Sequence, residues 1–284
     1  MPDSLDQRDR APTHDGARRT VGSKARVRHY WDETPCGSTT SSSVPLSRRY
    51  FDEIEAYRYR VEPEIFSFAQ FTRYHGKRVL EVGVGTGTDF LQWARAGAQA
   101  YGIDLTNAAM QHVRKRLELY DLPGQLCAGD AEILPFRTSS FDLAYSFGVI
   151  HHTPDTAAAL REMMRVVRPG GRVKVMVYNR HSLTAFWLWV RKAFLRGKPW
   201  KSFTWCLANF MESPGTKAYT ARELREMVSH YRAVSTIAAV PTIYDRLGLD
   251  RGLLGRIGMI VASLAPTRFG WWLTVDLLKA EDHS

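Results

Sequence analysis

The stretch LEVGVGTGTDF, residues 80–90, combines an acidic side chain with glycines at alternate positions. The acid is Glu81, and the glycines are Gly83, Gly85 and Gly87. Such a run lets the backbone approach a bound ligand closely. The stretch is not a GxxxxGK[ST] phosphate loop, and its GxGxG spacing differs from the GxGxxG of dinucleotide-binding folds. Because the loop also lacks a basic residue that could neutralise a pyrophosphate, we expect a cationic ligand without phosphate.

Two further acids follow expected strands. Asp104 ends the segment AQAYGIDL, where its carboxylate could accept hydrogen bonds from both hydroxyls of a ribose. Asp130, in GDAEILPF, could accept from an adenine amino group while Ala131 supplies a backbone N–H. Ligands of open α/β sheets bind at the carboxyl ends of the strands, so these acids and Glu81 should share one crevice. S-adenosylmethionine, which carries a sulfonium and no phosphate, fits this set better than the alternative of three merely solvated strand ends.

A pair of histidines follows the fourth expected strand, in the segment GVIHHTPD. Histidine titrates near neutral pH and could accept a proton from a hydroxyl or a carbon acid. His151 and His152 are therefore the candidate catalytic residues, and His151 lies nearer the strand end. They could equally cap the following helix or pack the loop. A phenolate or enolate acceptor would need no base.

Strands and helices alternate from Lys77 onward, which predicts a mostly parallel, doubly wound α/β sheet. Thr106 is the expected N-cap of the second helix, and the segment Pro169-Gly170-Gly171 is expected to end the third. The expected strands span residues 78–83, 98–105, 125–130, 141–150, 172–179, 232–240 and 271–280. The expected helices span residues 88–97, 106–124, 155–171 and 220–231.

The remaining segments flank or interrupt this core, which we place at 77–180 and 220–284. Residues 1–27 are polar and arginine-rich, and we expect a disordered basic tail. Residues 28–76 are expected to form an N-terminal lid with a helix from Asp52. Two aromatic insertions, residues 181–219 and 241–270, are expected to form a helical cap over the crevice.

The first insertion has a distinctive composition. Residues 180–211 contain eight aromatic residues, six Lys or Arg and no acid. One helical face is apolar; it carries Leu183, Phe186, Trp187, Val190 and Phe194. The segment could line a pocket for a hydrophobic acceptor, pack the cap onto the core, or lie on an anionic membrane. The first and third readings both favour an apolar acceptor.

Several of these motifs occur in one order that resembles the class I S-adenosylmethionine-dependent methyltransferases. They are VLEVGVGTGTDF, GIDL, GDAEILPFRTSSFDLAYSFGVIHH and ALREMMRVVRPGGRVKVMVYN. The similarity is closest to the branch with the ubiquinone and menaquinone C-methyltransferases, and it is close over residues 77–180 and loose over 218–280. It implies a Rossmann-like seven-stranded sheet of order 3-2-1-4-5-7-6 with an antiparallel seventh strand.

The resemblance also implies roles for individual residues toward S-adenosylmethionine. Glu81, Gly83, Gly85 and Gly87 would line the methionine end, Asp104 and Leu105 the ribose, Asp130 and Ala131 the adenine, and Phe147 and Gly148 would flank the cofactor. The segments HYWDETPCGS and EAYRYRVEP resemble N-terminal parts of some of these enzymes. Their candidate lid or substrate residues are Tyr30, Trp31, Tyr57, Tyr59 and Arg60, and Tyr178 joins this group. These residues could instead be ordinary packing aromatics, and Cys36 is expected to be structural.

Charge and cysteine content limit the remaining functional classes. The net charge of +10 could indicate nucleic acid, an anionic membrane, an acidic substrate, or a high-GC genome that favours arginine. Three separated cysteines and no long apolar run favour a reducing, cytoplasmic setting, with membrane association open, and we expect no metal site. An RNA or protein methyltransferase and a non-methylating cofactor-binding relative remain alternatives. No RNA-binding module is recognisable, and SFGV stands where an NPPY-type signature would follow strand four, so nucleic acid is not the expected partner. The oligomeric state stays open.

Overall fold

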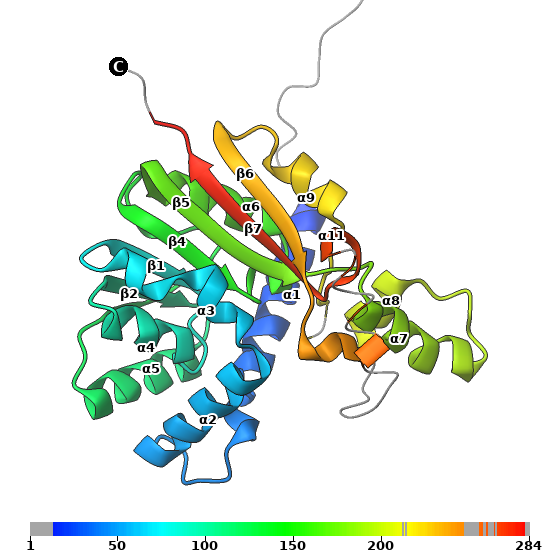
Figure 1. Ribbon diagram of the computed structural model, residues 1–284, viewed down its shortest axis with the longest axis horizontal. Helices are drawn as coiled ribbons and strands as arrows, with labels where there is room; N and C mark the ends of the chain where they lie inside the picture. Colours follow the sequence, from blue (N-terminus) through cyan, green and yellow to red (C-terminus); the bar gives the residue numbers. More distant parts are fainter. Residues whose placement is uncertain are drawn as a thin grey trace, which may run out of the picture.

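Seven strands form one mixed sheet in the computed structural model of the chain, which describes residues 14–211, 213, 215–246, 256, 257, 260, 264 and 266–281 (Figure 1). The strand order is β3-β2-β1-β4-β5-β7-β6. The strands are β1 (Arg78–Val82), β2 (Gln99–Asp104), β3 (Gln125–Ala128), β4 (Phe141–Phe147), β5 (Val167–Tyr178), β6 (Ala233–Val240) and β7 (Trp272–Lys279). The first five are parallel, whereas β7 runs antiparallel to both β5 and β6. The expected Rossmann-like topology is confirmed.

Helices cover both faces of this sheet because alternate strand residues point to opposite sides. Val79 and Leu143 pack on one side with helices α4 (Thr88–Arg95) and α5 (Asn107–Tyr120). Leu80 and Ala144 pack on the other side with α6 (Thr156–Val166) and α9 (Ala221–Val228). The expected N-cap of α5 is confirmed, since the side chain of Thr106 accepts a hydrogen bond from the backbone N–H of Ala109.

One helix boundary differs from the expectation. The third expected helix was placed at 155–171, but α6 ends at Val166 and β5 already begins at Val167. Pro169 disfavours a helical conformation for the residue before it, so the chain leaves the helix early. The register of β5 against β4 then shifts between the pairs Phe141–Val167 and Leu143–Arg172, which accommodates the proline and two glycines as an irregularity inside the strand.

The N-terminal part is helical where a disordered tail was expected. Helix α1 spans His14–Glu33, so residues 14–27 belong to an ordered element, while residues 1–13 lie outside the described part. The helix is held by polar contacts to the core: Arg28 Nε donates to the carbonyl of Leu105 at 2.9 Å, and Asp32 Oδ1 accepts from the backbone N–H of Ala108 at 3.1 Å. Polar residues that hold a helix in this way do not produce an apolar stripe in the sequence. The polar, arginine-rich composition of residues 1–27 therefore predicted disorder.

Residues 34–76 follow as short helical pieces. They are η1 (Ser38–Thr40), α2 (Arg48–Val61), α3 (Glu64–Ala69) and η2 (Phe71–Tyr74). The long helix expected from Asp52 is thus divided at Pro63, which lacks the N–H that an uninterrupted helix would need. A further short helix, η3 (Ile150–His152), follows β4.

The two insertions lie next to each other. The first forms α7 (Leu183–Lys192), η4 (Phe194–Arg196) and α8 (Phe203–Phe210), a helical hairpin that projects from the body at the right of Figure 1. The second contributes η5 (Ile243–Arg246) and α11 (Pro266–Phe269), and most of its residues between these two elements lie outside the described part. No helix within the described residues is both long and apolar enough to cross a bilayer.

Candidate active site

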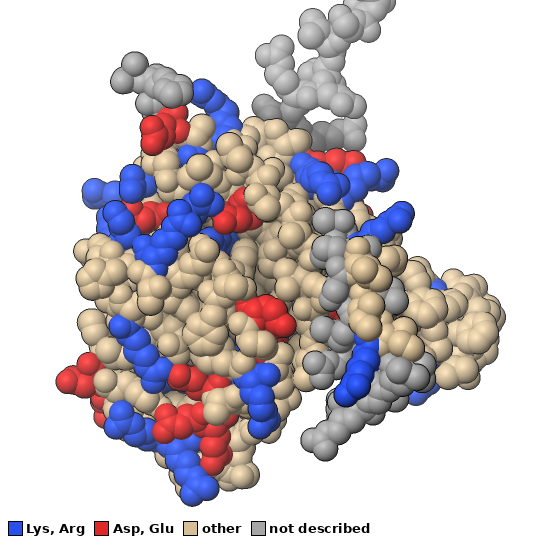
Figure 2. All heavy atoms as spheres, in the orientation of Figure 1, with Lys and Arg blue, Asp and Glu red and all other residues tan. Residues whose placement is uncertain are grey.

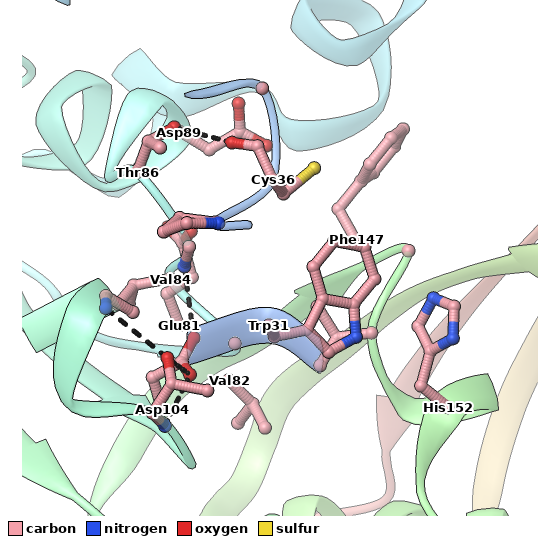
Figure 3. A pocket seen from close by; sticks show the side chains of 18 of the residues that line it. Trp31, Cys36, Glu81, Val82, Val84, Thr86, Asp89, Asp104, Phe147 and His152 are labelled. Atoms are coloured by element: carbon pink, nitrogen blue, oxygen red, sulfur yellow. Dashed lines mark hydrogen bonds between the residues drawn. The ribbon is translucent and has the colours of Figure 1, made fainter. Parts of the chain in front are cut away.

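A cavity of about 300 Å³ opens where β1, β2 and β4 end, at the carboxyl edge of the sheet (Figure 3). Its floor comes from the strand ends, and its cover comes from α1, the 35–40 loop and α2. This is the edge at which open α/β sheets bind ligands, and the volume lies at the lower end of the ~300–1,000 Å³ typical of small-molecule sites. Tyr244 of η5 completes the rim. No lining residue comes from α7 or α8, so the expectation that residues 181–219 cover the crevice finds no support among the described contacts.

Most of the expected cofactor residues meet in this cavity. Those that line it are Glu81, Gly83, Gly85, Asp104, Leu105, Asp130, Ala131, Phe147 and Gly148. Gly87 does not line it; with φ 78° it forms the N-cap of α4, and a Cβ there would lie 2.9 Å from Val113 Cγ2. The third glycine of the turn therefore serves close packing of α4 against α5.

The expected lid and substrate residues are divided. Trp31, Tyr57 and Tyr178 line the cavity, whereas Tyr30, Tyr59 and Arg60 do not. The hydroxyl of Tyr59 donates toward Asp89 Oδ1 at 3.1 Å, behind the wall, and the guanidinium of Arg60 lies over the ring of Tyr57 at 5.4 Å. Cys36, expected to be structural, lines the cavity wall, and its backbone carbonyl accepts a hydrogen bond from Thr86.

Asp104 is held in place by the turns around it. Its Oδ2 accepts from the backbone N–H of Gly85 at 3.1 Å, and its Oδ1 accepts from the backbone and hydroxyl of Thr106 at 3.0 and 2.8 Å. Burial raises the pKa of Asp104, while these donors oppose the rise. Oδ1 already accepts two hydrogen bonds, whereas Oδ2 accepts one and has a further lone pair, so the side chain can still accept a hydroxyl from a ligand at Oδ2.

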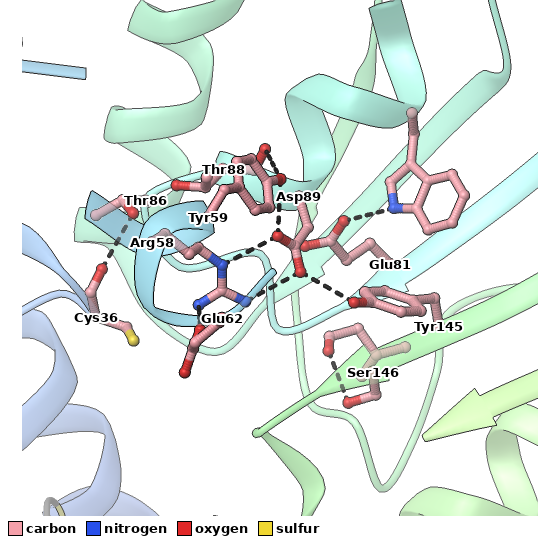
Figure 4. Close-up of polar contacts among 12 residues, drawn as sticks. Cys36, Arg58, Tyr59, Glu62, Glu81, Thr86, Thr88, Asp89, Tyr145 and Ser146 are labelled. Atoms are coloured by element: carbon pink, nitrogen blue, oxygen red, sulfur yellow. Dashed lines mark hydrogen bonds and ion pairs between the residues drawn. The ribbon is translucent and has the colours of Figure 1, made fainter. Parts of the chain in front are cut away.

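A buried charge cluster that the sequence did not indicate lies beside the glycine turn (Figure 4). Asp89, whose side chain is 3% exposed, receives both Nε and Nη2 of Arg58 at 3.0 Å and the hydroxyl of Tyr145 at 3.0 Å. Glu81 accepts from Trp93 Nε1 at 2.9 Å, and burial together with Asp89 raises its pKa well above the ordinary value. Asp89 stood in the motif itself, but nothing in the sequence linked it to Arg58, because only the packing of α2 brings the two together.

A lysine from α1 lines the cavity beside Asp130. Lys24 Nζ lies 2.6 Å from Asp130 Oδ2 and 2.5 Å from Glu132 Oε2. Burial lowers the pKa of Lys24, but the hydrogen bonds to the two carboxylates outweigh it, so the net shift is upward. Lys24 thus occupies a lone pair of the acid that was expected to receive an adenine amino group.

The two candidate catalytic histidines differ in their relation to the cavity. His152 lines it, and its ring meets the Trp31 ring edge-on at 5.4 Å. Its Nδ1 lies 2.7 Å from Ser213 Oγ and 3.2 Å from Thr216 Oγ1. His151 is fully buried, packs on the Tyr178 ring at 4.3 Å, and does not line the cavity, although it stands nearer the strand end.

Both histidines should make the fold sensitive to acid. Burial first, and then nearby positive charge, lowers the pKa of His152 to about 3 and that of His151 well below its ordinary value. In the unfolded chain both imidazoles bind a proton below pH ~6.5, whereas in the folded protein they stay neutral. Their contribution to the free energy of unfolding is therefore fully present above that pH and is lost as the pH falls. Below pH ~6.5 each histidine should lower the free energy of unfolding by ~1.4 kcal/mol per pH unit.

The His151→Phe variant isolates the contribution of His151 to this pH dependence of stability. Urea unfolding at about pH 7.5 and about pH 5.5 should show that the variant loses ~1.4 kcal/mol less than the parent protein over this interval. Glu81, with its raised pKa, titrates in the opposite sense, so the quantity to compare is the difference between the two proteins. Equal pH dependence of parent and variant would contradict a neutral, buried His151.

Comparison with known proteins shows the family to which the chain is similar. Residues 80–175 match the family described as Methyltransferase domain. The chain is 30% identical over 188 residues to a demethylmenaquinone methyltransferase of Renibacterium salmoninarum, covering 62% of this chain and 74% of the relative. It is 32% identical over 143 residues to a malonyl-[acyl-carrier protein] O-methyltransferase of Halorhodospira halophila, covering 50% of this chain and 48% of the relative. The chain therefore spans about half the length of one relative and about three quarters of the other.

A solved structure supports the same fold. The magnesium protoporphyrin IX methyltransferase of Synechocystis PCC 6803 with bound SAH superimposes with a TM-score of 0.57 at 13% identity, covering 90% of this chain and 100% of that one. Together with the sheet order and the strand-end acids, these matches show that the chain belongs to the class I S-adenosylmethionine-dependent methyltransferases. Its cofactor is S-adenosylmethionine.

Proposed function

We propose that this protein transfers the methyl group of S-adenosylmethionine to a small hydrophobic acceptor, at oxygen or at carbon. The observation that carries the proposal is a cavity whose lining is charged in one part and mainly apolar in another. Glu81, Asp89 and Arg58 lie beside the glycine turn, and the Arg58 guanidinium lies 5.5 Å from the centroid of the Phe147 ring, where the two parts meet. The mainly apolar or aromatic part of the wall comprises Trp31, Phe147, Val149, Met176 and Tyr178. The names of the relatives, which refer to demethylmenaquinone and malonyl-[acyl-carrier protein], favour such an acceptor over RNA.

The residues around the cavity suit the groups that the cofactor carries. Arg58 would pair with the methionine carboxylate, and the acids beside it would favour the amino group and the sulfonium. Asp104 would accept from the ribose, and Asp130 from the adenine once Lys24 moves aside. When bound, the cofactor supplies a methyl group on a positively charged sulfur that is already activated for displacement. The chain itself has to align the acceptor and exclude water.

The acceptor end of the cavity favours orientation rather than strong base catalysis. His152 is neutral at physiological pH, because burial lowers its pKa to about 3, and its contact with Ser213 fixes the ring. We assign it the positioning of an acceptor hydroxyl or enol, while His151 acts only through packing. Trp31, carried by α1, covers this end and limits the access of water. Peripheral contact of residues 181–211 with a membrane is a second part of the proposal.

A labelled-methyl assay tests the proposal. The purified protein with methyl-labelled cofactor should label a member of an acceptor panel that contains a demethylated quinol, a thioester-linked malonyl group and a long-chain alcohol. Asp104→Ala should lose activity at low cofactor concentration and bind S-adenosylhomocysteine ~10–100-fold more weakly, because the charged acceptor for the ribose is lost and the Gly85 turn loses its hydrogen bond to Asp104. Parent protein that binds the cofactor but labels nothing across the panel would count against methyl transfer to this class of acceptor.

A further inference from the structure

The end of the α7–α8 hairpin exposes large apolar side chains that the methyl-transfer site does not use. We call residues 194–200, with the sequence FLRGKPW, the hairpin tip. Phe194, Leu195 and Trp200 are 54%, 69% and 73% exposed. The tip turns at Gly197, whose φ is 68°, and it lies in the projection seen at the right of Figure 1. Isolated exposed apolar residues are ordinary, but a group of this size at one protruding end marks an interaction surface.

The charge around the tip is of one sign. Arg196 and Lys198 alternate with the exposed apolar residues, and Lys192 and Lys201 flank them. Lys192 Nζ lies 5.1 Å from the centroid of the Phe210 ring and Lys201 Nζ lies 4.7 Å from that of Trp205, so these cations lie against aromatic rings at the base of the tip. No acidic residue occurs between residues 180 and 211. In the view of Figure 2 the projecting lobe is mainly tan, whereas blue and red alternate over the body.

We propose that the hairpin tip docks this protein on an anionic phospholipid bilayer. Leu195, Trp200 and Phe194 would enter the boundary between headgroups and acyl chains, and Arg196 and Lys198 would contact the lipid phosphates. Aromatic and aliphatic side chains interleaved with Lys and Arg suit this depth of insertion, because their long stems let the cations reach the interface.

The same hairpin is connected to the rim of the active site. The hydroxyl of Thr184 in α7 donates to Asp245 Oδ1 of η5 at 3.0 Å, and Asp245 is fully buried. The neighbouring Tyr244 lines the cavity. A docked tip would therefore fix the orientation of the cavity rim relative to the membrane from which a lipophilic acceptor would come. Supply of the acceptor from the bilayer rests on the proposed methyl transfer to a hydrophobic acceptor, whereas the docking, which specifies the membrane contact proposed above, does not.

Sedimentation of the full chain with vesicles tests the docking. The parent protein should bind vesicles of equal parts phosphatidylglycerol and phosphatidylcholine at low salt, and bind pure phosphatidylcholine at least ten times more weakly. Arg196→Gln with Lys198→Gln should weaken binding to the anionic vesicles ~25-fold, since each cation near such a surface contributes about a factor of five. Leu195→Ser with Trp200→Ser should weaken it by at least about tenfold, because two apolar side chains no longer enter the boundary.

Matched controls separate the tip from net charge and from folding. Arg222→Gln with Arg225→Gln on α9 removes the same charge elsewhere on the surface, and Val234→Ser removes an exposed apolar residue of β6; both should bind as the parent does. All tip variants should keep the parent's affinity for S-adenosylhomocysteine, which shows that they fold. Trp200→Phe should in addition lose much of the quenching of tryptophan fluorescence by brominated phosphatidylglycerol.

Three outcomes would overturn the inference. The first is equal binding to neutral and anionic vesicles. The second is a loss of vesicle binding in the α9 control as large as that in the tip variants. The third is a dimer, formed without lipid, that dissociates in Leu195→Ser with Trp200→Ser, because the tip would then be a protein interface. The vesicle experiment contains neither cofactor nor acceptor, so its result is independent of whether methyl transfer to a hydrophobic acceptor is found.

Discussion

Arg58→Met is expected to reduce the affinity for S-adenosylhomocysteine by at least ~100-fold and to lower the free energy of unfolding by ~3 kcal/mol. The guanidinium makes two hydrogen bonds to Asp89, whose side chain is almost fully buried, next to the buried Glu81. Without Arg58, the buried Asp89 carboxylate keeps only the hydroxyl groups of Tyr59 and Tyr145 as hydrogen-bond donors and has no cation beside it. Burying a carboxylate without a paired cation lowers the stability of the fold by several kcal/mol. Calorimetry with S-adenosylhomocysteine and urea unfolding measure the two effects separately.

Comparison variants identify the cause. Arg60→Met removes a nearby arginine that is exposed and outside the cavity, and it should change stability by no more than ~0.5 kcal/mol. Arg58→Met combined with Asp89→Asn removes both charges and should regain part of the stability, whereas ligand affinity should stay low. Arg58→Lys keeps the charge but cannot make both hydrogen bonds, so its stability and ligand affinity should lie between those of the parent and those of Arg58→Met. An Arg58→Met protein that binds within about twofold of the parent would show that the cofactor carboxylate is held elsewhere.

Gly83→Ala is expected to have the second large effect, because the backbone and the space both require glycine there. The φ of Gly83 is 84°, a left-handed conformation that costs an alanine ~1–2 kcal/mol. A Cβ would also lie 2.3 Å from Cγ1 of Val149, across the floor of the cavity, so that the loop after β4 would have to move. We expect a loss of ~2–5 kcal/mol in stability and a clear loss of cofactor affinity, measured by thermal unfolding and calorimetry.

Gly76→Ala provides the matched comparison. Gly76 has a φ of 69°, but a Cβ there would meet no atom within 4 Å, so only the backbone strain of ~1–2 kcal/mol should appear and ligand binding should stay intact. Adding Val149→Ala to Gly83→Ala should relieve part of the clash and recover some affinity. If Gly83→Ala and Gly76→Ala are equally mild, the close contact with Val149 is not what requires glycine at position 83.

The core of the fold and the cofactor end of the site were accessible from the sequence. Short apolar runs predicted the strands, and periodic segments that follow glycine turns or caps predicted the helices. The resemblance to class I methyltransferases implied a strand order that the sheet confirms. Because parallel strands of such a sheet all end at one edge, the residues directly after them had to meet there. This is why Glu81, Asp104 and Asp130 line one cavity.

The cover of the site was not accessible in the same way. Trp31 was a lid candidate through the family resemblance, but nothing in the sequence indicated Lys24, which reaches the cavity from a helix that also makes polar contacts to the core. Arg58 and Arg60 stand two positions apart in one helix, about 200° around its axis, and their sequence context does not reveal which one faces Asp89. The choice between His151 and His152 has the same origin, since adjacent residues of a short helical turn point in different directions.

The sequence by itself determined the alternation of strands and helices along the chain, the glycine turn and the acids at the strand ends, because these depend on local backbone preferences and on the shared edge of a parallel sheet. The spatial order of the strands was implied by the resemblance to a known family. Only the tertiary structure decided the pairing of Arg58 with Asp89, the position of Trp31 over His152, and the projection of the hairpin tip away from the cavity. Those features depend on the angles at which helices far apart in the chain pack against the sheet, and no local pattern of residue types encodes such angles.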